Sequence, residues 1–170
     1  PKVCILTSGV GSRLKEYTKD KNKALLTIEK KAAISHIIDN FPKETQFIIS
    51  IGYKGKLVKD FIKVHHPKIN VKFINVKKYK GKGSGPAKSL NYCKKYLQEP
   101  FYFVSCDTLW KKNIYGNHNK NWMGCYNSKN FKSKDYCNLI FNKNKITKII
   151  DKKNIEKKYI YKIFVGLAFI

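Results

Sequence analysis

Short apolar runs alternate with helix-period segments over the first hundred residues, and this alternation most constrains the fold. Continuous apolar runs predict strands, and apolar residues at helical spacing, such as Ile34, Ile37, Ile38 and Phe41, predict helices. The predicted strands are 3–6, 46–51, 71–76 and 101–105, and the predicted helices are 32–41, 56–65 and 87–97. Strands that alternate with helices of this length indicate βαβ units and a parallel sheet covered on both faces.

The pattern changes beyond Asp107. Strand-like segments follow one another without a helix between them, at 122–126, 136–141, 146–150 and 161–170. Residues 142–145 read Asn-Lys-Asn-Lys, which favours a hairpin turn. We therefore predict a Rossmann-like α/β fold whose mostly parallel sheet is extended by antiparallel C-terminal strands. With no internal repeat or linker, residues 1–170 are expected to form one domain, truncated where the chain stops inside an apolar run.

The charge of the chain invites a nucleic-acid interpretation. Lysine and arginine total 36 against 11 acidic residues, for a formal charge of +25. The lysines are spread along the whole chain, and no basic stripe accompanies a recognition helix or paired stacking aromatics. A solvated lysine surface that attracts small anions is the favoured interpretation. A basic nucleic-acid-binding protein remains an alternative.

The remaining composition points to a cytoplasmic protein. No apolar run reaches the roughly 18 residues of a membrane span, and no secretory leader is visible. The five cysteines show no C-x-x-C spacing, which favours reduced thiols over disulfides or zinc ligands.

A single arginine stands among these basic residues, in a glycine loop after the first strand. Arg13 follows Gly9 and Gly11, and every other basic residue is lysine. A guanidinium is planar and offers a fork of donors that matches two phosphate oxygens, whereas a lysine is a point charge. Glycines let backbone N–H groups approach an anion closely. The segment therefore predicts a phosphate-binding loop.

Two other phosphate-binding loops fit less well. A dinucleotide fingerprint requires a third glycine, where this chain has Leu14, and an acid after the second strand, where it has Gly52 and Tyr53. Residues 83–89 imitate a Walker loop, but one residue is missing and Ala87 replaces the last glycine.

Nine residues after Arg13, the stretch Asn22-Lys23-Ala24-Leu25-Leu26 completes a larger pattern. The order G-x-G-S-R-L and then P-K-A-L-L resembles the nucleotidylyltransferases that join an NTP to a sugar phosphate or phosphocholine (MobA-like NTP transferase domain), with Asn22 in the proline position. That exchange alters loop stiffness and leaves the lysine. Later segments match in order along essentially the whole chain: Ile51-Gly52-Tyr53, Gly83-Ser84-Gly85, residues 103–107, residues 149–152 and Val165-Gly166-Leu167.

The resemblance implies a role for each matching residue. Arg13 and Lys23 would be catalytic, and Asp107 would bind Mg²⁺. Acceptor binding would fall to Asp151, Lys152 and Gly166. The nucleotide-binding residues implied are Leu6, Ser8, Gly9, Gly11, Ser12, Gly83 and Ser84. The implied partners are an NTP and a small phosphorylated acceptor. The turn at 83–86 looks more like the cytidylyltransferase branch than the thymidylyltransferases, which favours CTP.

Apart from the resemblance, the chemistry of nucleotidyl transfer requires residues of these types. An acceptor phosphate must attack the α-phosphorus of an NTP in line and expel pyrophosphate, and both reactants are polyanions. Backbone N–H groups of residues 8–12 would cradle the triphosphate, and Arg13 would clamp its β and γ groups. Lys23 would lie near the α-phosphate, and a divalent ion on Asp107 would bridge the reacting phosphates. No covalent nucleophile is needed.

Several alternatives stay open. Instead of binding a metal, Asp107 could cap a turn. Lys23 could be one more solvated lysine, and Asp151 and Lys152 could be an ordinary surface pair. Family members also bind the metal through a second aspartate on a later strand, for which Asp135 in a loop-like segment is a poor candidate. Either the sequence is truncated before that aspartate or catalysis is impaired or lost, so an inactive nucleotide-binding homologue is a further alternative. Remaining aromatic and histidine side chains are ambiguous: Trp110 and Trp122 border the acceptor or belong to the core, His65-His66 marks a helix end, and His118 lies in a polar loop.

Overall fold

A computed structural model describes residues 1–111, 114–116, 120–127, 131–156 and 158–170, so that His118 lies outside the described residues. Contacts between residues divide the chain into two compact units. The first comprises 1–121 with Phe169 and Ile170, and the second comprises 122–168. The two units are described separately.

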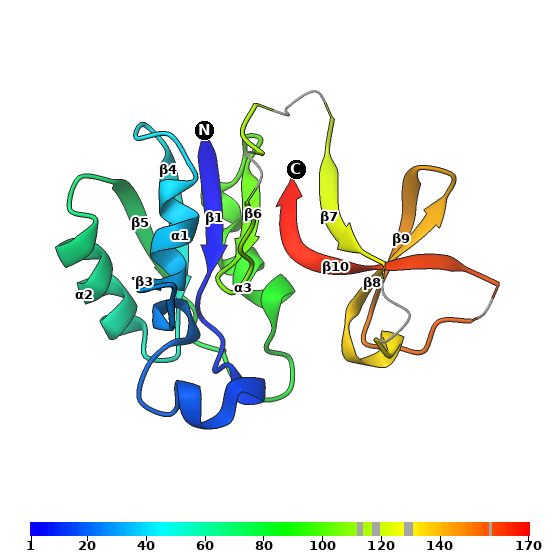
Figure 1. Ribbon diagram of the computed structural model, residues 1–170, viewed down its shortest axis with the longest axis horizontal. Coiled ribbons are helices and arrows are strands. Elements are labelled where there is room, and N and C mark those ends of the chain that lie inside the picture. The colour runs from blue at the N-terminus through cyan, green and yellow to red at the C-terminus, as the bar shows by residue number, and fades with distance from the viewer. Residues whose placement is uncertain (112–113, 117–119, 128–130, 157) are drawn as a thin grey trace. The chain divides into compact units, whose positions relative to one another are not determined.

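The first unit contains the predicted parallel sheet, with strand order β5-β4-β1-β6 (Figure 1). Strands β1 (Lys2–Leu6), β4 (Gln46–Ile51), β5 (Asn70–Asn75) and β6 (Tyr102–Ser105) pair in parallel. Val3, Cys4 and Ile5 of β1 are fully buried, as expected for a strand covered on both faces. At the far edge, Phe101 and Ile170 exchange two backbone hydrogen bonds, which is an antiparallel pairing.

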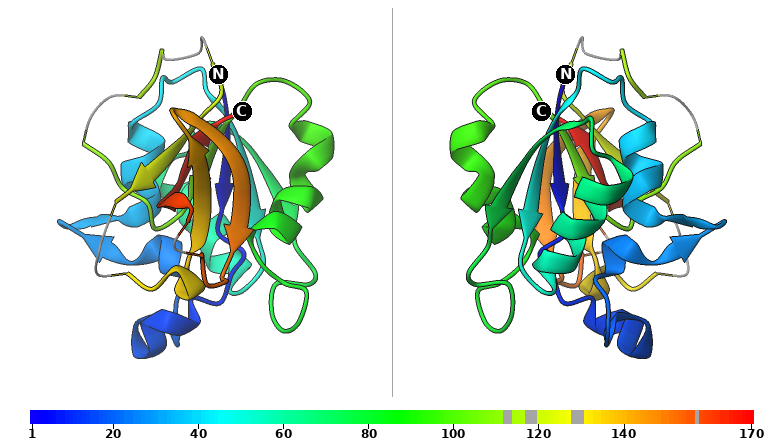
Figure 2. Two further views of the ribbon diagram at one scale, coloured as in Figure 1. Left: turned by 90° about the vertical axis from the view of Figure 1, so that its right-hand side faces the viewer. Right: turned by 90° about the vertical axis from the view of Figure 1, so that its left-hand side faces the viewer.

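Among the described residues, three α-helices cover this sheet. Helices α1 (Ala33–Asp39) and α2 (Gly55–His65) lie on one face and α3 (Pro86–Cys93) on the other (Figure 2). This division follows from right-handed crossovers, because the chain moves outward from β1 to β5 and then returns to β6. The predicted helix at 87–97 is shorter as an α-helix and finishes in a 3-10 turn, η3 (Lys94–Tyr96).

Some local elements of the first unit are not predicted from the sequence. The glycine loop leads into the 3-10 segment η1 (Ser12–Thr18), and η2 (Lys23–Leu25) follows. Strands β2 (Thr27–Ile28) and β3 (Lys31–Ala32) form a small hairpin. Its turn residues Glu29 and Lys30 both have positive φ (48° and 66°), which the tight hairpin turn requires although neither is Asn or Gly.

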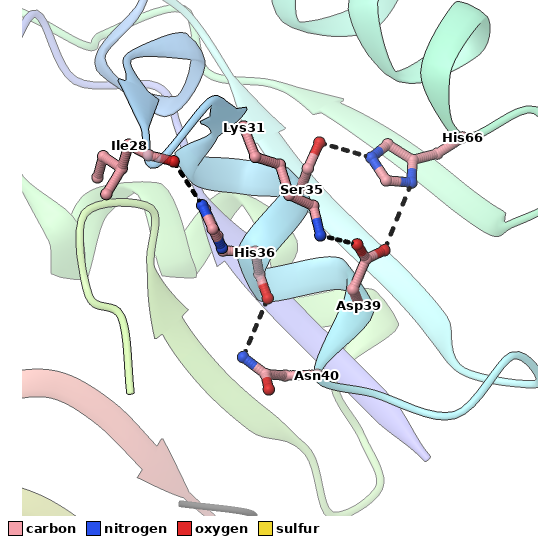
Figure 3. A network of polar contacts seen from close by, with 7 residues as sticks. All are labelled: Ile28, Lys31, Ser35, His36, Asp39, Asn40 and His66. Atoms are coloured by element: carbon pink, nitrogen blue, oxygen red, sulfur yellow. Dashed lines mark hydrogen bonds and ion pairs between the residues drawn. The ribbon is translucent and has the colours of Figure 1, made fainter. Parts of the chain in front are cut away.

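A polar cluster ties α1 to the end of α2 and to this hairpin (Figure 3). Ser35 and His66 share a 2.7 Å hydrogen bond, and His66 lies 4.0 Å from the carboxylate of Asp39. Lys31 pairs with Asp39 as well. We call Lys31, Ser35, Asp39 and His66 the helix cluster. Because burial outweighs the attraction of Asp39, the pKa of His66 lies below its ordinary value.

The second unit is antiparallel, as the sequence predicts. Strands β8 (Cys137–Asn142) and β9 (Lys145–Asp151) form a hairpin around residues 143–144, and β10 (Ile160–Phe169) pairs with β8. Strand β7 (Trp122–Tyr126) pairs with β10, and η4 (Ser133–Asp135) precedes β8. The fold class predicted from the sequence is therefore confirmed. Within the described ranges, none of the helices has the length and apolar character needed to span a lipid bilayer.

Candidate functional site

The strand order of the first unit reverses beside β1. The chain runs from β1 outward through β4 to β5, then returns to β6 on the other side of β1. The carboxyl ends of β1 and β6 therefore flank a topological switch point, where open α/β sheets bind their ligands. Leu6 pairs with Ser50 on one side and with Ser105 on the other, so the loops after these three strands begin level with one another.

The loop after β1 is held from both sides by buried polar groups. Thr7 donates to the carbonyl of Ser50 through both its backbone N–H (3.0 Å) and its hydroxyl (2.7 Å). The carbonyl of Ser8 accepts the N–H of Tyr53 at 2.9 Å, and its hydroxyl lies 2.7 Å from that of Ser89 in α3. The side chain of Ser8 is thus an anchor inside the fold, and its backbone remains the part predicted to meet phosphate.

Three glycines shape this loop for different reasons. A Cβ on Gly52 would lie 2.8 Å from the carbonyl oxygen of Ser8, so only glycine lets the two loops approach. Gly11 has φ +68°, and a Cβ there would lie 3.0 Å from Thr18. A Cβ on Gly9 would meet no atom within 4 Å. Packing therefore explains Gly52 and Gly11, whereas beside Gly9 there is open space of the kind a ligand needs.

Ser12 and Arg13 open η1 and are both exposed. Lys15 breaks the segment with φ 42° and ψ −114°. The hydroxyl of Thr18 contacts the carbonyls of Gly11 and Lys15, both at 3.2 Å, and so closes the segment back onto the glycine loop.

Asn22 lies at the centre of these loops and is completely buried. Its amide donates to the carbonyl of Thr7 at 2.8 Å and to that of Tyr53 at 2.7 Å. Its side-chain oxygen accepts the N–H of Ala24 at 2.9 Å and so caps η2, which carries Lys23. One side chain thus joins the loops after β1 and β4.

Lys23 reaches Asp107, which follows β6. Nζ lies 3.0 Å from Oδ2 although 84 residues separate the pair, and the two side chains are 20% and 53% exposed. Burial lowers the pKa of Lys23, but Cys106 and Asp107 outweigh it, so the pKa lies above 10.5. The positive charge of Arg13 opposes this rise.

The thiol of Cys106, the residue before Asp107, is a poor nucleophile. Burial raises the pKa of its thiol to about 12, with Lys23 lowering it and Asp107 raising it. The thiol is therefore neutral near pH 7, and a neutral thiol is a poor nucleophile.

The turn at 83–85 precedes α3. Gly83 and Gly85 have φ of +81° and +142°, conformations that favour glycine. Ser84 donates through its N–H (3.1 Å) and its hydroxyl (2.7 Å) to the carbonyl of Gly81. Ser89 connects this turn to the glycine loop, since its hydroxyl contacts both Ser8 and the carbonyl of Gly85.

The three predicted acceptor residues all fall in the second unit. Asp151 ends β9, and Lys152 follows with φ 49° and donates its N–H to Tyr136 at 2.9 Å. Gly166 lies in β10 with φ 80° and is buried. Asp135 lies in η4 and is exposed. Within the first unit, the ring of Trp110 meets Phe41 edge-on at 6.0 Å, so it packs against a core residue.

The positions that hold the site together are not predicted from the sequence. In the sequence Asn22 is a replacement in the proline position of a motif, and Ser89 is part of a Walker-like stretch. Their partners are backbone carbonyls and a hydroxyl from distant segments, which leave no local pattern in the sequence. The asparagine just before a short helical turn was the available signal, because asparagine is a favoured N-cap.

No protein-family model matches the chain. Two curated proteins resemble it in sequence. It is 27% identical over 111 residues to the bifunctional protein GlmU of Methanocaldococcus jannaschii, a match covering 65% of this chain and 26% of that protein. It is also 27% identical over 107 residues to the D-glycero-alpha-D-manno-heptose 1-phosphate guanylyltransferase of Campylobacter jejuni, covering 62% and 47%. The matches thus span about a quarter and about half of these relatives.

Solved structures share the fold. A CTP:phosphocholine cytidylyltransferase from Streptococcus pneumoniae superimposes with a TM-score of 0.74 at 24% identity, over 99% of this chain and 69% of that one. A putative glucose-1-phosphate thymidylyltransferase from Bacillus anthracis gives 0.72 at 19% identity, over 99% and 71%. The resemblance to the nucleotidylyltransferases seen in the sequence is therefore confirmed.

Proposed function

We propose that this chain, which resembles the nucleotidylyltransferases in sequence and in fold, is the nucleotide-binding core of an enzyme that transfers a nucleotidyl group from an NTP to a small phosphorylated acceptor, with release of pyrophosphate. The observation that carries the proposal is the 3.0 Å pair of Lys23 and Asp107. A cation and a carboxylate meet at the switch point of a parallel sheet, beside a glycine loop with open space at Gly9.

Each group has a task set by charge. The acceptor phosphate attacks the α-phosphorus, the bond from that phosphorus to the bridging oxygen breaks, and the pair of electrons leaves with pyrophosphate. Lys23 offsets the charge that grows on the α-phosphoryl oxygens. Arg13, exposed at the start of η1, holds two oxygens of the departing phosphates through its fork of donors. Backbone N–H groups around Gly9 bind the triphosphate and orient it.

A magnesium ion fits the residues present. Mg²⁺ is held by one or two carboxylates together with substrate phosphates, and Asp107 offers a half-exposed carboxylate at the edge of the site. When bound, the ion would neutralise phosphate charge. With an NTP present, Lys23 exchanges its contact with Asp107 for one with phosphate.

The finer assignments belong to the same proposal. CTP is the favoured nucleotide, based on the turn Gly83-Ser84-Gly85, and the acceptor is a phosphorylated sugar or a small alcohol such as phosphocholine. The guanylyltransferase, cytidylyltransferase and thymidylyltransferase relatives show that similar chains serve different bases. Asp151, Lys152 and Gly166 are the proposed acceptor residues.

A thermal-shift panel of CTP, UTP, GTP, ATP and dTTP, each with Mg²⁺, tests the proposal first. One NTP should raise the melting temperature more than the others, because a ligand that binds the folded state stabilises it. Pyrophosphate release is then followed with that NTP and a panel of sugar phosphates and phosphocholine. Stabilisation without turnover on any acceptor would favour an inactive nucleotide-binding homologue. Salt-sensitive binding of DNA or RNA without any NTP response would overturn the proposal.

A further inference from the structure

The hydrogen bonds of Asn22 lie outside the nucleotide, metal and acceptor roles proposed above. The residue is 0% exposed. Both donors of its amide and its oxygen acceptor are used, on Thr7, Tyr53 and Ala24 at 2.7–2.9 Å. Two of these partners lie 15 and 31 residues away. Such a side chain fixes the relative positions of three backbone segments, because each bond has a required direction.

Lys23 is the residue most closely held by this arrangement. Its backbone lies between Asn22 and Ala24, and the N–H of Ala24 is bound to the side chain of Asn22. The carbonyl of Asn22 accepts the next N–H, that of Leu25, at 2.9 Å. The stem of Lys23 also lies close to Gly11, where an added Cβ would come within 3.5 Å of its Cβ. The direction in which Lys23 leaves the backbone is therefore set by Asn22.

We infer that Asn22 is the positioning residue of the Lys23–Asp107 pair. By binding the carbonyls of Thr7 and Tyr53, it joins the loops after β1 and β4, and through Lys23 it connects them to Asp107 after β6. Its consequence for catalysis rests on the nucleotidyl transfer proposed above. Its consequence for Lys23 does not, and can be measured without any substrate.

The substrate-free test follows the acylation of Lys23 by N-hydroxysuccinimidyl acetate, quantified by peptide mass spectrometry. In the wild-type chain, Lys23 should react slowly, because its side chain is 20% exposed and paired. In Asn22→Ala, we expect its rate to rise about tenfold, because the three side-chain hydrogen bonds that orient the segment carrying Lys23 are lost. Lys56, with an 89% exposed side chain, is the internal reference.

Two further variants keep the test decisive. Asn22→Ser retains a good N-cap for Ala24 but is too short to bridge both carbonyls, so it should fold and still release Lys23. Ser35→Ala removes a partly buried 2.7 Å hydrogen bond in the helix cluster and serves as the matched control. Lys23 should react in Ser35→Ala as in the wild type. An unchanged Lys23 rate in folded Asn22→Ser and Asn22→Ala would overturn the inference.

The kinetic test separates this inference from the proposed function. If pyrophosphate release is observed, Asn22→Ser should lower kcat about tenfold with a smaller change in KM. A displaced Lys23 loses more of its interaction with the transition state than of its interaction with the bound substrate. Faster Lys23 acylation in a chain that shows no turnover would support the positioning role while contradicting the activity. Equal kcat in Asn22→Ser and wild type would contradict a catalytic consequence.

Discussion

The first unit contains two polar clusters that look alike as lists of residues and differ in where the fold places them. The Lys23–Asp107 cluster and the helix cluster each join a lysine to an aspartate, and each adds a buried polar residue, Asn22 or Ser35. The first lies where three parallel strands end beside glycines. The second lies where α1 meets the end of α2 and the β2–β3 hairpin (Figure 3), and there Ser35 binds His66, which follows α2. Because the two clusters contain similar residue types, it is the position at the topological switch point that makes the first one the candidate functional site.

The largest expected difference between the two clusters is in turnover. Lys23→Ala should lower nucleotidyl transfer by about 10²- to 10³-fold, the usual cost of removing one preorganised group that stabilises charge in the transition state. Lys31→Ala breaks the equivalent ion pair in the helix cluster and should leave transfer unchanged. Pyrophosphate release at saturating NTP measures both. An equal loss in the two variants would mean that the clusters do not differ in role.

The next largest expected effect is on stability and comes from the close packing around the glycine loop. Gly52→Ala should lower the free energy of unfolding by about 2 kcal/mol, because the new methyl group would lie 2.8 Å from the backbone oxygen of Ser8. Gly9→Ala is the matched control, since nothing lies within 4 Å of its Cβ. Gly9→Ala should keep its stability and weaken NTP binding instead. Urea unfolding and titration calorimetry report the two quantities, and a stable Gly52→Ala chain would refute the close packing.

Arg13→Lys should lower nucleotidyl transfer less than Lys23→Ala does. The charge is kept and the fork of donors is lost, so we expect turnover to fall about tenfold. An intact chain with unchanged turnover would show that Arg13 does not clamp phosphates. Lys19→Arg is the control, because Lys19 is also exposed and its φ lies in the helical region. This variant should leave turnover unchanged.

The smallest effect concerns pH and falls on the helix cluster. Burial holds the pKa of His66 below 6.5, so the folded state favours the neutral ring. This contribution to stability is complete above pH 6.5 and is lost as the pH falls through the lower pKa of the folded state, because the unfolded chain takes up the proton first. Urea midpoints between pH 8 and pH 5 should fall more for the wild type than for His66→Gln. Parallel curves would contradict this.

The sequence was sufficient for the elements whose signal is local. The strand at 46–51 and the strand at 122–126 were predicted with their observed limits, because continuous apolar runs mark buried strands. The hairpin at β2–β3 was missed, since its turn uses Glu29 and Lys30 in place of Asn-Gly. The 3-10 character of η1 was missed as well, because its kink at Lys15 follows from contacts with Thr18 and carries no pattern of its own.

The amino-acid sequence by itself determined the order of strands and helices, the glycine loop with its one arginine, and the resemblance that named Lys23 and Asp107. Only the tertiary structure decided that these two side chains, 84 positions apart in the sequence, meet, because the intervening chain had to fold into β4, β5 and their crossovers before β6 could lie beside β1. It also turned Asn22 from a departure in a motif into the buried link between two loops. Hydrogen bonds to distant carbonyls depend on where the backbone goes, which no local run of residues specifies.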